Sequence, residues 1–370
     1  MTPMKSFTRG FTLVELMVGM VIGLIATLAM MNVMINAEEQ KRTTTGGMDA
    51  QVNAALALTA LTRDIEKAGY GFSSITEIVG CPLQNSYRGT GLAGMPANLV
   101  PLIITPGVSG APDTIRTISS NKNSFSIPIR VTAPTYTPGT SLEFNVASVR
   151  GVEGPVTDGS GNLLFSGNLM VAATNAATPC QIFEVTSVAG SKVARLDTAN
   201  WNPASFPNRS YANGSVLVNL GSLGDATYFV DNGDLKQTSF VRASNGSASY
   251  QTFTVHNNIV QIKALYGKDT NNDGAVDTWD TVTPTTNAGW LQLIAVRLAV
   301  VARSAQMEKD PVTFANPTWD VGNADTVTGA TACGSSKCIS LKVNNLTNWD
   351  RYRYKMFDTT VPLRNMVWKS

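Results

Sequence analysis

The N-terminal part of the chain changes abruptly from polar to apolar. Residues 1–10 carry two basic side chains, Lys5 and Arg9, whereas the run 11–37 has Glu15 as its one charged residue. As a helix, about 25 residues of this run would extend about 37 Å, enough to cross a hydrocarbon core of about 30 Å. The pattern predicts one membrane span with its basic side in the cytoplasm.

After the apolar run, charged residues at 38–42 mark the exit into water, and the sequence TTTGG follows at 43–47. Glycine and threonine have low helix propensity. We therefore expect a kink or a melted turn near Gly46-Gly47.

A helical stripe then resumes and ends at a glycine. Leu58, Leu61, Ile65 and Ala68 recur at helical spacing, and Gly69 is a suitable C-terminal cap. The segment 38–70 is therefore predicted to continue the helix as an amphipathic half that docks on a sheet.

The rest of the chain is typical of antiparallel β structure. Residues 71–112, rich in proline and glycine, predict a long irregular connector. Short strand-like runs bounded by Gly, Asn, Pro or Asp follow at 124–131, 141–149, 181–188 and 215–221.

Two later segments give sharper predictions. In 226–242, Asn232-Gly233 separates two alternating segments, which predicts a two-residue β-hairpin turn. The β-branched run 290–304 favours a central strand covered on at least one face, with a helix as the alternative.

The expected fold is α+β: a long N-terminal helix, membrane-spanning in its first half, packed on an antiparallel β-rich head. The expected divisions are a leader at 1–10, a transmembrane helix at 11–37, its amphipathic continuation at 38–70 and an extracytoplasmic head at 71–370.

Composition supports an exported head and argues against nucleic-acid binding. Charged residues make up 15% of the chain, and 28 basic residues against 26 acidic ones leave a net charge of +2. The basic residues are scattered, so no direct nucleic-acid contact is predicted.

The four cysteines, Cys81, Cys180, Cys333 and Cys338, form an even set without metal-binding spacing. The short, glycine-containing segment between Cys333 and Cys338 favours a local disulfide, which leaves Cys81 with Cys180. Four free thiols are the alternative, because disulfides need an oxidising compartment.

Glu15 is anomalous, since an ionised carboxylate in lipid costs a few kcal/mol and marks a candidate functional residue. It lies in the sequence Gly10-Phe11-Thr12-Leu13-Val14-Glu15-Leu16. This sequence resembles the prepilin cleavage motif of type IV pilins and type II secretion pseudopilins. An ordinary signal anchor, with Glu15 reaching to the interface, is the alternative.

The resemblance implies specific processing. A membrane aspartyl prepilin peptidase would cut between Gly10 and Phe11 and methylate the new N-terminus at Phe11. Glu15 could then pair with the Phe11 ammonium of a neighbouring subunit. Because an unpaired buried charge costs roughly 3–5 kcal/mol, this pairing would favour one axial register in a filament.

Other segments are similar to PilW-type minor pilins of the type IV pilus. They are the helix end at 60–72, the hairpin at 226–242, the strand at 290–304 and the tail at 351–366. The resemblance therefore covers both ends of the chain and parts of its middle, and it implies that the α+β fold is pilin-like.

A candidate structural Ca²⁺ site lies between two of the predicted strands. Its residues match the spacing of an EF-hand-like loop, with glycine at the sixth position, a backbone carbonyl from Ala275, and a terminal Asp in place of the usual Glu. A solvated turn without metal is the alternative. The candidate ligands are Asp269, Asn271, Asp273, Ala275, Asp277 and Asp280.

No catalytic motif accompanies His256, which is the one histidine of the chain. We expect a structural histidine and no enzymatic activity.

The preferred interpretation is a minor pilin that promotes pilus assembly near the tip and supports twitching, adhesion or DNA uptake. Implied partners are other minor pilins, the major pilin, the prepilin peptidase, the inner-membrane assembly platform and a tip adhesin. The protein would span the inner membrane once, with its head in the periplasm, before reaching the surface pilus. The alternatives are a type II secretion pseudopilin and a membrane-anchored exported binding protein or enzyme.

Overall fold

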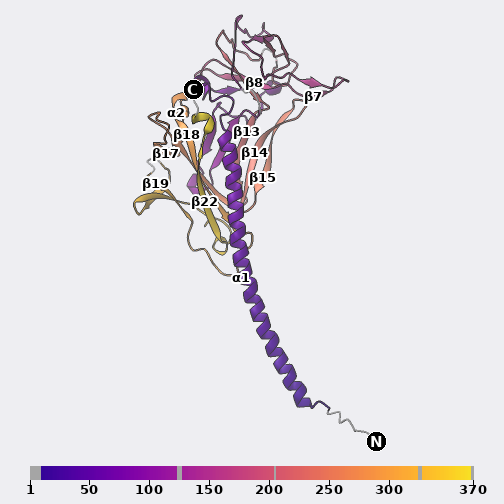
Figure 1. The fold of residues 1–370 in the computed structure, drawn as a ribbon, viewed down its shortest axis with the longest axis vertical. Coiled ribbons are helices and arrows are strands. Elements are labelled where there is room, and N and C mark those ends of the chain that lie inside the picture. The colour runs from indigo at the N-terminus through magenta and orange to yellow at the C-terminus, as the bar shows by residue number, and fades with distance from the viewer. Residues whose placement is uncertain (1–9, 123–126, 204–205, 324–326, 368–370) are drawn as a thin grey trace, which may run out of the picture.

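The computed structural model describes residues 10–122, 127–203, 206–323 and 327–367, apart from the side chains at 36, 39 and 42–45. Its longest element is α1 (Leu13–Lys67), a helix of 55 residues. At 1.5 Å per residue this helix is about 82 Å long. Its first half projects from the head as a bare stalk, and its second half runs along the head (Figure 1). Residues 1–9 of the predicted leader 1–10 lie outside the described residues.

The two halves of α1 differ because their side chains differ. The stretch Leu13–Ile35 is apolar on all sides and entirely exposed. Farther along, one face becomes buried, with Leu61, Ile65 and Ala68 fully covered and Leu58 packed beside them. The predicted docking of this stripe on the head is therefore confirmed.

The expected break near Gly46-Gly47 is wrong, because α1 continues through both glycines. Gly46 is buried, and a Cβ at this position would lie 3.3 Å from Cβ of Ser304. The helix thus stays intact at two residues of low helix propensity, where it packs closely against the head. The helix ends at Lys67, and Gly69 follows with a φ of +79°.

Two sheets form the part of the head that α1 contacts. We call them the hairpin sheet and the C-terminal sheet. The hairpin sheet has the order β15 (Ala248–His256), β14 (Asp234–Arg242), β13 (Gly224–Asp231), β3 (Thr114–Ser119) and β2 (Leu102–Thr105). The C-terminal sheet has the order β17 (Thr278–Asp280), β16 (Ile259–Lys268), β18 (Leu293–Arg303) and β22 (Tyr354–Pro362).

A third large sheet, the distal sheet, lies at the end of the head away from the stalk (Figure 1). Its order is β1 (Leu83–Gln84), β9 (Cys180–Glu184), β8 (Leu169–Ala173), β12 (Val216–Gly221) and β4 (Ile129–Arg130). Its β1–β9 pair is parallel, whereas the other pairs in the described sheets are antiparallel.

Smaller elements complete the described head. The small sheets contain β10 (Ser187–Ala189), β11 (Lys192–Ala194) and β5 (Glu143–Asn145); β19 (Thr318–Gly322), β21 (Ser336–Ser340) and β20 (Ala330–Cys333); and β6 (Val156–Thr157) with β7 (Leu163–Phe165). The short helices are α2 (Asn287–Leu291), α3 (Arg364–Val367), η1 (Thr76–Ile78), η2 (Tyr87–Gly89), η3 (Val108–Gly110) and η4 (Trp349–Arg351). The α+β fold class is confirmed.

The hairpin prediction at 226–242 is confirmed. Strands β13 and β14 pair from Ala226 opposite Ser239 to Asp231 opposite Asp234. The turn residues Asn232 and Gly233 have φ values of 54° and 81°. Positive φ at both positions is what a two-residue turn requires to match the twist of the strands.

The run 290–304 is a central strand, as predicted, but it starts later. Trp290 belongs to α2, and β18 begins at Leu293 between β16 and β22. Side chains on one face of β18 join the core beneath α1, whereas Ala299 and Val301 on the other face pack with Trp319. Cover on both faces explains the nearly continuous apolar run.

The earlier strand-like runs are shorter in the structure than in the sequence pattern. They correspond to β4, to β5, to β9 with β10, and to β12, while 124–126 lie outside the described residues. The connector 71–112 is mostly irregular, with short helices and the strands β1 and β2 inside it. Proline and glycine limit regular pairing in this segment.

Candidate assembly site

The candidate processing site precedes the first turn of α1. Gly10 and Phe11 are exposed and lie outside the helix, with 86% of Phe11 accessible. A peptidase needs an accessible, non-helical backbone around the bond that it cuts. The arrangement at Gly10-Phe11 meets this requirement.

Thr12 and Glu15 cap the start of α1 reciprocally. The Thr12 hydroxyl accepts from the Glu15 N–H at 3.3 Å, and Glu15 Oε2 accepts from the Thr12 N–H at 3.1 Å and its hydroxyl at 3.0 Å. These contacts satisfy N–H groups that have no partner within the helix. Thr12 was not selected from the sequence, although its spacing from Glu15 is the signature of a capping box.

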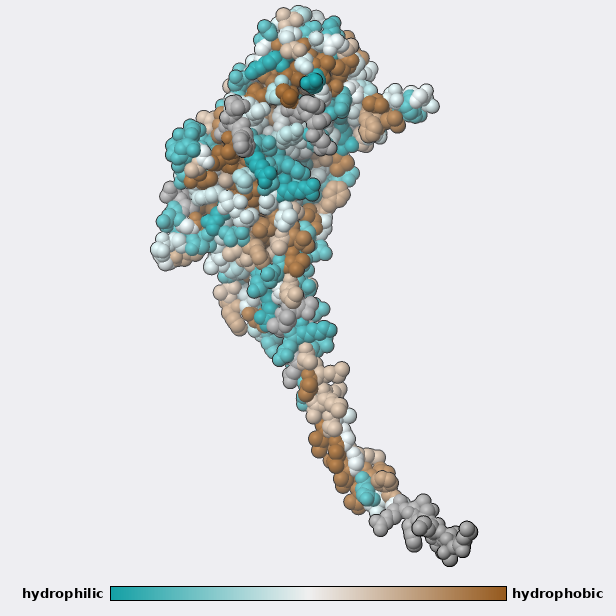
Figure 2. Space-filling view, in the orientation of Figure 1, coloured by the Kyte–Doolittle hydropathy of each residue, from teal (hydrophilic) through white to brown (hydrophobic). Residues whose placement is uncertain are grey.

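The exposed half of α1 has the dimensions of a membrane span. Leu13–Ile35 contains 23 residues with a mean hydropathy of 2.3 and no burial against the head. Its apolar surface forms the brown stalk in Figure 2. Length and composition therefore make this segment suitable for insertion into a hydrocarbon core.

A hydrogen-bonded cluster joins the middle of the head to α1. Tyr228 on β13 donates its hydroxyl to Oδ2 of Asp64 on α1 at 2.5 Å. Gln237 on β14 donates to the Tyr228 hydroxyl at 2.9 Å and to Asp64 Oδ2 at 3.3 Å. Burial, together with the Asp64 carboxylate, raises the pKa of Tyr228 above its ordinary value of 10.

The C-terminal tail holds the end of the same helix. The Asn365 amide in α3 donates to the carbonyl oxygens of Glu66, Lys67 and Ala68 at 3.4, 3.2 and 3.2 Å. Arg364 forms an ion pair with Glu66 at 3.2 Å. Because the last carbonyls of a helix lack partners within it, this tail acts as a cap supplied from far along the chain.

The predicted calcium loop is compact around its first aspartate. Asp269 is buried, and its two oxygens accept from the N–H groups of Asp273 and Gly274 at 3.2 and 2.9 Å. Gly274 has a φ of +87°, which provides the expected sharp turn. The backbone therefore curls toward the Asp269 carboxylate.

Three further predicted ligands lie together in this loop. The Asn271 amide donates to Asp273 Oδ2 at 3.2 Å and to Asp277 Oδ1 at 3.1 Å. The Thr270 hydroxyl and N–H donate to Asp277 Oδ2 at 2.8 and 2.6 Å and lower the pKa of that carboxyl. The donor set of carboxylate, amide and carbonyl oxygens suits a hard cation.

Asp280, the last predicted ligand, forms hydrogen bonds with residues outside this group. Both of its oxygens are 2.8 Å from Lys268 Nζ, and Oδ1 also accepts from the Val282 N–H at 2.8 Å. The two charged side chains are 12% and 13% exposed, so the ion pair is largely shielded from water. The structure therefore brings together the loop residues from Asp269 to Asp277 and gives Asp280 a different partner.

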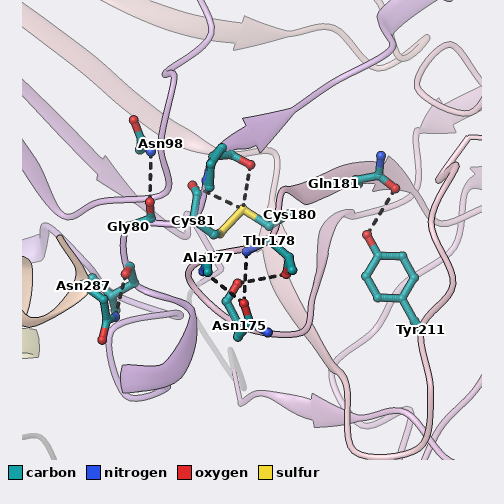
Figure 3. Close-up of a disulfide and its surroundings, with 12 residues drawn as sticks. Gly80, Cys81, Asn98, Asn175, Ala177, Thr178, Cys180, Gln181, Tyr211 and Asn287 are labelled. Carbon is teal, nitrogen blue, oxygen red and sulfur yellow. Dashed lines mark hydrogen bonds between the residues drawn. A yellow bond between two sulfur atoms is a disulfide. The ribbon is translucent and has the colours of Figure 1, made fainter. Parts of the chain in front are cut away.

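The expected disulfide between Cys81 and Cys180 is present in the structure. Both cysteines are buried, and Cys180 begins β9 while Cys81 lies in the connector before β1. Asn98 donates to the carbonyl oxygen of Gly80 at 2.9 Å beside the bridge (Figure 3). This disulfide attaches the connector to the distal sheet.

The second expected disulfide joins Cys333 and Cys338. It closes the turn between β20 and β21, where Cys333 pairs with Ser336. The bridge therefore supports a local hairpin.

A cavity of about 590 Å³ lies where the end of α1 meets the hairpin sheet. Asp64, Lys67, Asn121 and Asp225 are among its lining residues. The described lining includes hydroxyl, amide and charged groups but neither histidine nor cysteine.

His256 lies on β15, and partial burial lowers its pKa.

Two family models match opposite ends of the chain. The model described as Prokaryotic N-terminal methylation motif covers residues 5–31, and the model described as Type IV Pilus-assembly protein W covers residues 227–365. The first match and the apolar stalk together support a prepilin-type N-terminus that acts as a membrane anchor. The chain is therefore similar to prepilin-type proteins over its N-terminal segment and to the type IV pilus-assembly family PilW over its C-terminal region.

The match to the PilW family includes most of the surface that receives α1. It covers Tyr228 and Gln237 in the hairpin sheet, the strands β18 and β22, and Asn365 in α3. The matched families are pilus proteins and not enzymes. Comparison with curated proteins and with solved structures gives no match.

Proposed function

We propose that this protein is a minor pilin that primes or promotes assembly of a type IV pilus at or near its tip. The observation that carries the proposal is a prepilin-type start on a helix whose far end is fixed to a PilW-type head. Such a head is bulky for a subunit repeated along a thin fibre. The expected role is to provide a starting layer for other subunits.

In this mechanism the helix carries the assembly chemistry. The prepilin peptidase cuts after Gly10 and methylates Phe11, and the helix leaves the inner membrane to pack among other pilin helices. Glu15 then pairs with the N-terminal ammonium of a neighbour. The proposed partners are other minor pilins, the major pilin, the inner-membrane assembly platform and a tip adhesin.

Localisation follows from the same mechanism. Before assembly the protein spans the inner membrane once, with its head in the periplasm. After assembly it is part of a surface pilus that supports twitching, adhesion or DNA uptake. The two disulfides suit an oxidising compartment.

Deletion of the gene tests the pilus role against secretion. Sheared surface pilin and secreted enzymes are measured in the same strain, with the wild-type gene restored as the control. Lost pilin with normal secretion supports the proposal. Lost secretion with normal pilin identifies a pseudopilin, and no change in either favours an anchored binding protein or enzyme.

We also propose that the loop 269–277 binds Ca²⁺ in a structural role. Asp269, Asn271, Asp273 and Asp277 would supply side-chain oxygens, and Ala275 would supply its carbonyl oxygen. The buried Asp269 and the turn at Gly274 support this assignment. The Lys268 ion pair favours a site that does not use Asp280. A bound cation would offset the repulsion between the carboxylates and order the loop between β16 and β17.

A further inference from the structure

One edge strand of the head lacks the features that usually prevent strands of different molecules from pairing. Among the described sheets, the long edge strands are β15 and β22, each with nine residues. Edge strands are commonly protected by charged residues, proline or short length. β22 carries Lys355 and Asp358 and ends at Pro362, whereas β15 has the sequence ASYQTFTVH, with no acidic residue, lysine, arginine or proline.

The opposite edge of the same sheet shows the usual protection. β2 has four residues and lies between Pro101 and Pro106. A proline cannot donate a backbone hydrogen bond, so pairing along this edge is limited to these four residues. Within the hairpin sheet, an unprotected edge is thus confined to β15.

The middle of β15 is exposed on both faces of the sheet as well as at its edge. Gln251, Thr252, Phe253 and Thr254 are all exposed, with 49% of Phe253 accessible. Alternate residues of a strand point to opposite faces, so four consecutive exposed residues show that neither face is covered here. The strand is nevertheless regular, since it pairs with β14 in continuous register from Ala248 to Thr254.

Backbone geometry identifies the groups that point outward. The Ala248 N–H donates to the Tyr87 hydroxyl at 2.9 Å, so it faces away from β14. Because backbone direction alternates along an antiparallel strand, the N–H and C=O groups of Thr252 and Thr254 also face outward. In the described chain these backbone groups have no hydrogen-bond partner on that side.

The strand also lies on the flank that a neighbouring subunit would approach. β15 runs beside α1 (Figure 1), the helix that packs among other pilins in the proposed function. On α1 itself, Met48, Val52 and Leu56 form an exposed apolar stripe at helical spacing. A subunit whose helix packs against this one would bring its own head close to this flank.

We propose that β15 receives an extended, uncharged segment of a neighbouring pilin subunit of a different sequence, which adds a strand to the hairpin sheet. Main-chain hydrogen bonds to Thr252 and Thr254 give the contact its strength, and Phe253 gives it side-chain selectivity. The inference rests on the proposed function, because the helix packing brings the neighbour into reach. It adds a second contact between subunits, located in the heads.

Photo-crosslinking of the full-length chain in its own cells tests this inference. One version carries a photoreactive phenylalanine analogue at Phe253 and another carries it at Leu24 in the apolar half of α1. Adducts are identified by mass spectrometry. The Leu24 probe reports helix packing, which belongs to the proposed function, and the Phe253 probe reports the β15 contact.

A proline substitution tests whether the Phe253 adducts depend on strand addition or only on two subunits lying near each other. Thr252→Pro removes an outward N–H while leaving the ladder to β14 intact, because proline is tolerated where the N–H faces solvent. Gln251→Pro is the matched control, since its N–H points toward β14 and its loss should lower the Tm. We expect Thr252→Pro to leave the Tm of the purified full chain unchanged and to reduce Phe253 adducts at least tenfold, with Leu24 adducts retained.

Each outcome decides between the two proposals. Adducts of Phe253 with a different pilin that disappear in Thr252→Pro support strand addition. Three results would overturn strand addition and leave the proposed function intact. The Phe253 adducts persist in Thr252→Pro, or they contain only a second copy of this chain, or no Phe253 adduct forms while Leu24 captures pilins. If neither probe captures a pilin, the proposed function itself fails.

Discussion

The Glu15 carboxylate accepts two hydrogen bonds from Thr12, one from its N–H at 3.1 Å and one from its hydroxyl at 3.0 Å. This local capping box provides partners for Glu15 before any second subunit arrives. An ammonium from a neighbour would therefore add its charge to an already positioned carboxylate. Thr12 is then a positioning residue for the proposed pairing.

Substitutions at these two positions should have different effects. Glu15→Ala should still lose its leader but should enter filaments at least tenfold less, because the proposed charge pair is lost. Thr12→Ala should retain most incorporation, since it removes a cap worth about 1 kcal/mol but keeps the carboxylate. Immunoblots of sheared filaments and membranes measure both variants against wild type.

Mass spectrometry of the mature N-terminus supplies the check on processing. The wild-type chain and both variants should begin at N-methylated Phe11. Intact Met1 in mature filaments would exclude the proposed cleavage, and normal incorporation of Glu15→Ala would exclude the proposed pairing.

Alkaline pH should weaken the joint between α1 and the head. The folded pKa of Tyr228 is raised above that of the unfolded chain by burial and by Asp64. The folded state therefore retains a proton that the unfolded state loses, so the stabilisation is complete below about pH 10 and is lost as the pH rises further. The Tm of the full chain in detergent, measured from about pH 8 to about pH 11, should fall less steeply in Tyr228→Phe.

The same variant should already be less stable at about pH 8, by about 1–2 kcal/mol, because Asp64 loses a buried donor. Asp64→Asn, which removes the charge and keeps a similar shape, is the matched comparison. Parallel pH curves for wild type and Tyr228→Phe would show that this phenol does not control the alkaline transition.

Removal of the two disulfides should have unequal costs. The sequence separation is 99 for Cys81–Cys180 and 5 for Cys333–Cys338. Chain-entropy arguments give about 5 kcal/mol for a loop of about 100 residues and about 2 kcal/mol for a loop of about six. Double serine variants, compared by denaturant unfolding of the full chain, should show the larger loss for Cys81 and Cys180, and equal losses would contradict this ranking.

Calcium should stabilise the wild-type head, and Asp273→Ala should abolish this effect. At a free calcium concentration of about 100 times Kd, binding would add about 2.7 kcal/mol to the free energy of unfolding. Thermal melting with calcium or with a chelator measures the shift. Equal shifts in wild type and Asp273→Ala would exclude the proposed loop.

Asp280→Asn is the informative control for that experiment. It should lower the Tm with and without calcium, because Lys268 loses its shielded partner. The calcium-dependent shift should remain. Loss of the shift in this variant would instead restore Asp280 as a ligand.

Local sequence patterns predicted the features that depend on neighbouring residues. The Asn232-Gly233 turn requires only positive φ at two positions, and the helical stripe at Leu61 and Ile65 requires only helical spacing. The capping partner of Glu15 could also have been found, because Thr12 lies three residues before it.

Contacts between residues distant in sequence determine the features that local sequence patterns did not predict. Gly46 lies close to Ser304, which is distant in sequence, and the helix is continuous where propensity predicted a break. Asp280 fits a calcium spacing, but the pairing of β16 with β17 places it beside Lys268. Asn365 reaches α1 from the opposite end of the chain, and no short motif indicates this contact.

Because α1 is unbroken through Gly46 and Gly47, the number of residues in its first half affects the direction in which the head faces. One residue inserted into an α-helix turns everything beyond it by about 100° and advances it by about 1.5 Å. Because α1 has no flexible joint that could absorb this rotation, the number of residues between Phe11 and the docked stripe would set the direction in which the head faces around the axis of the proposed filament. An insertion or deletion in the stalk would leave the membrane anchor and the head fold intact while pointing the head at a different neighbour.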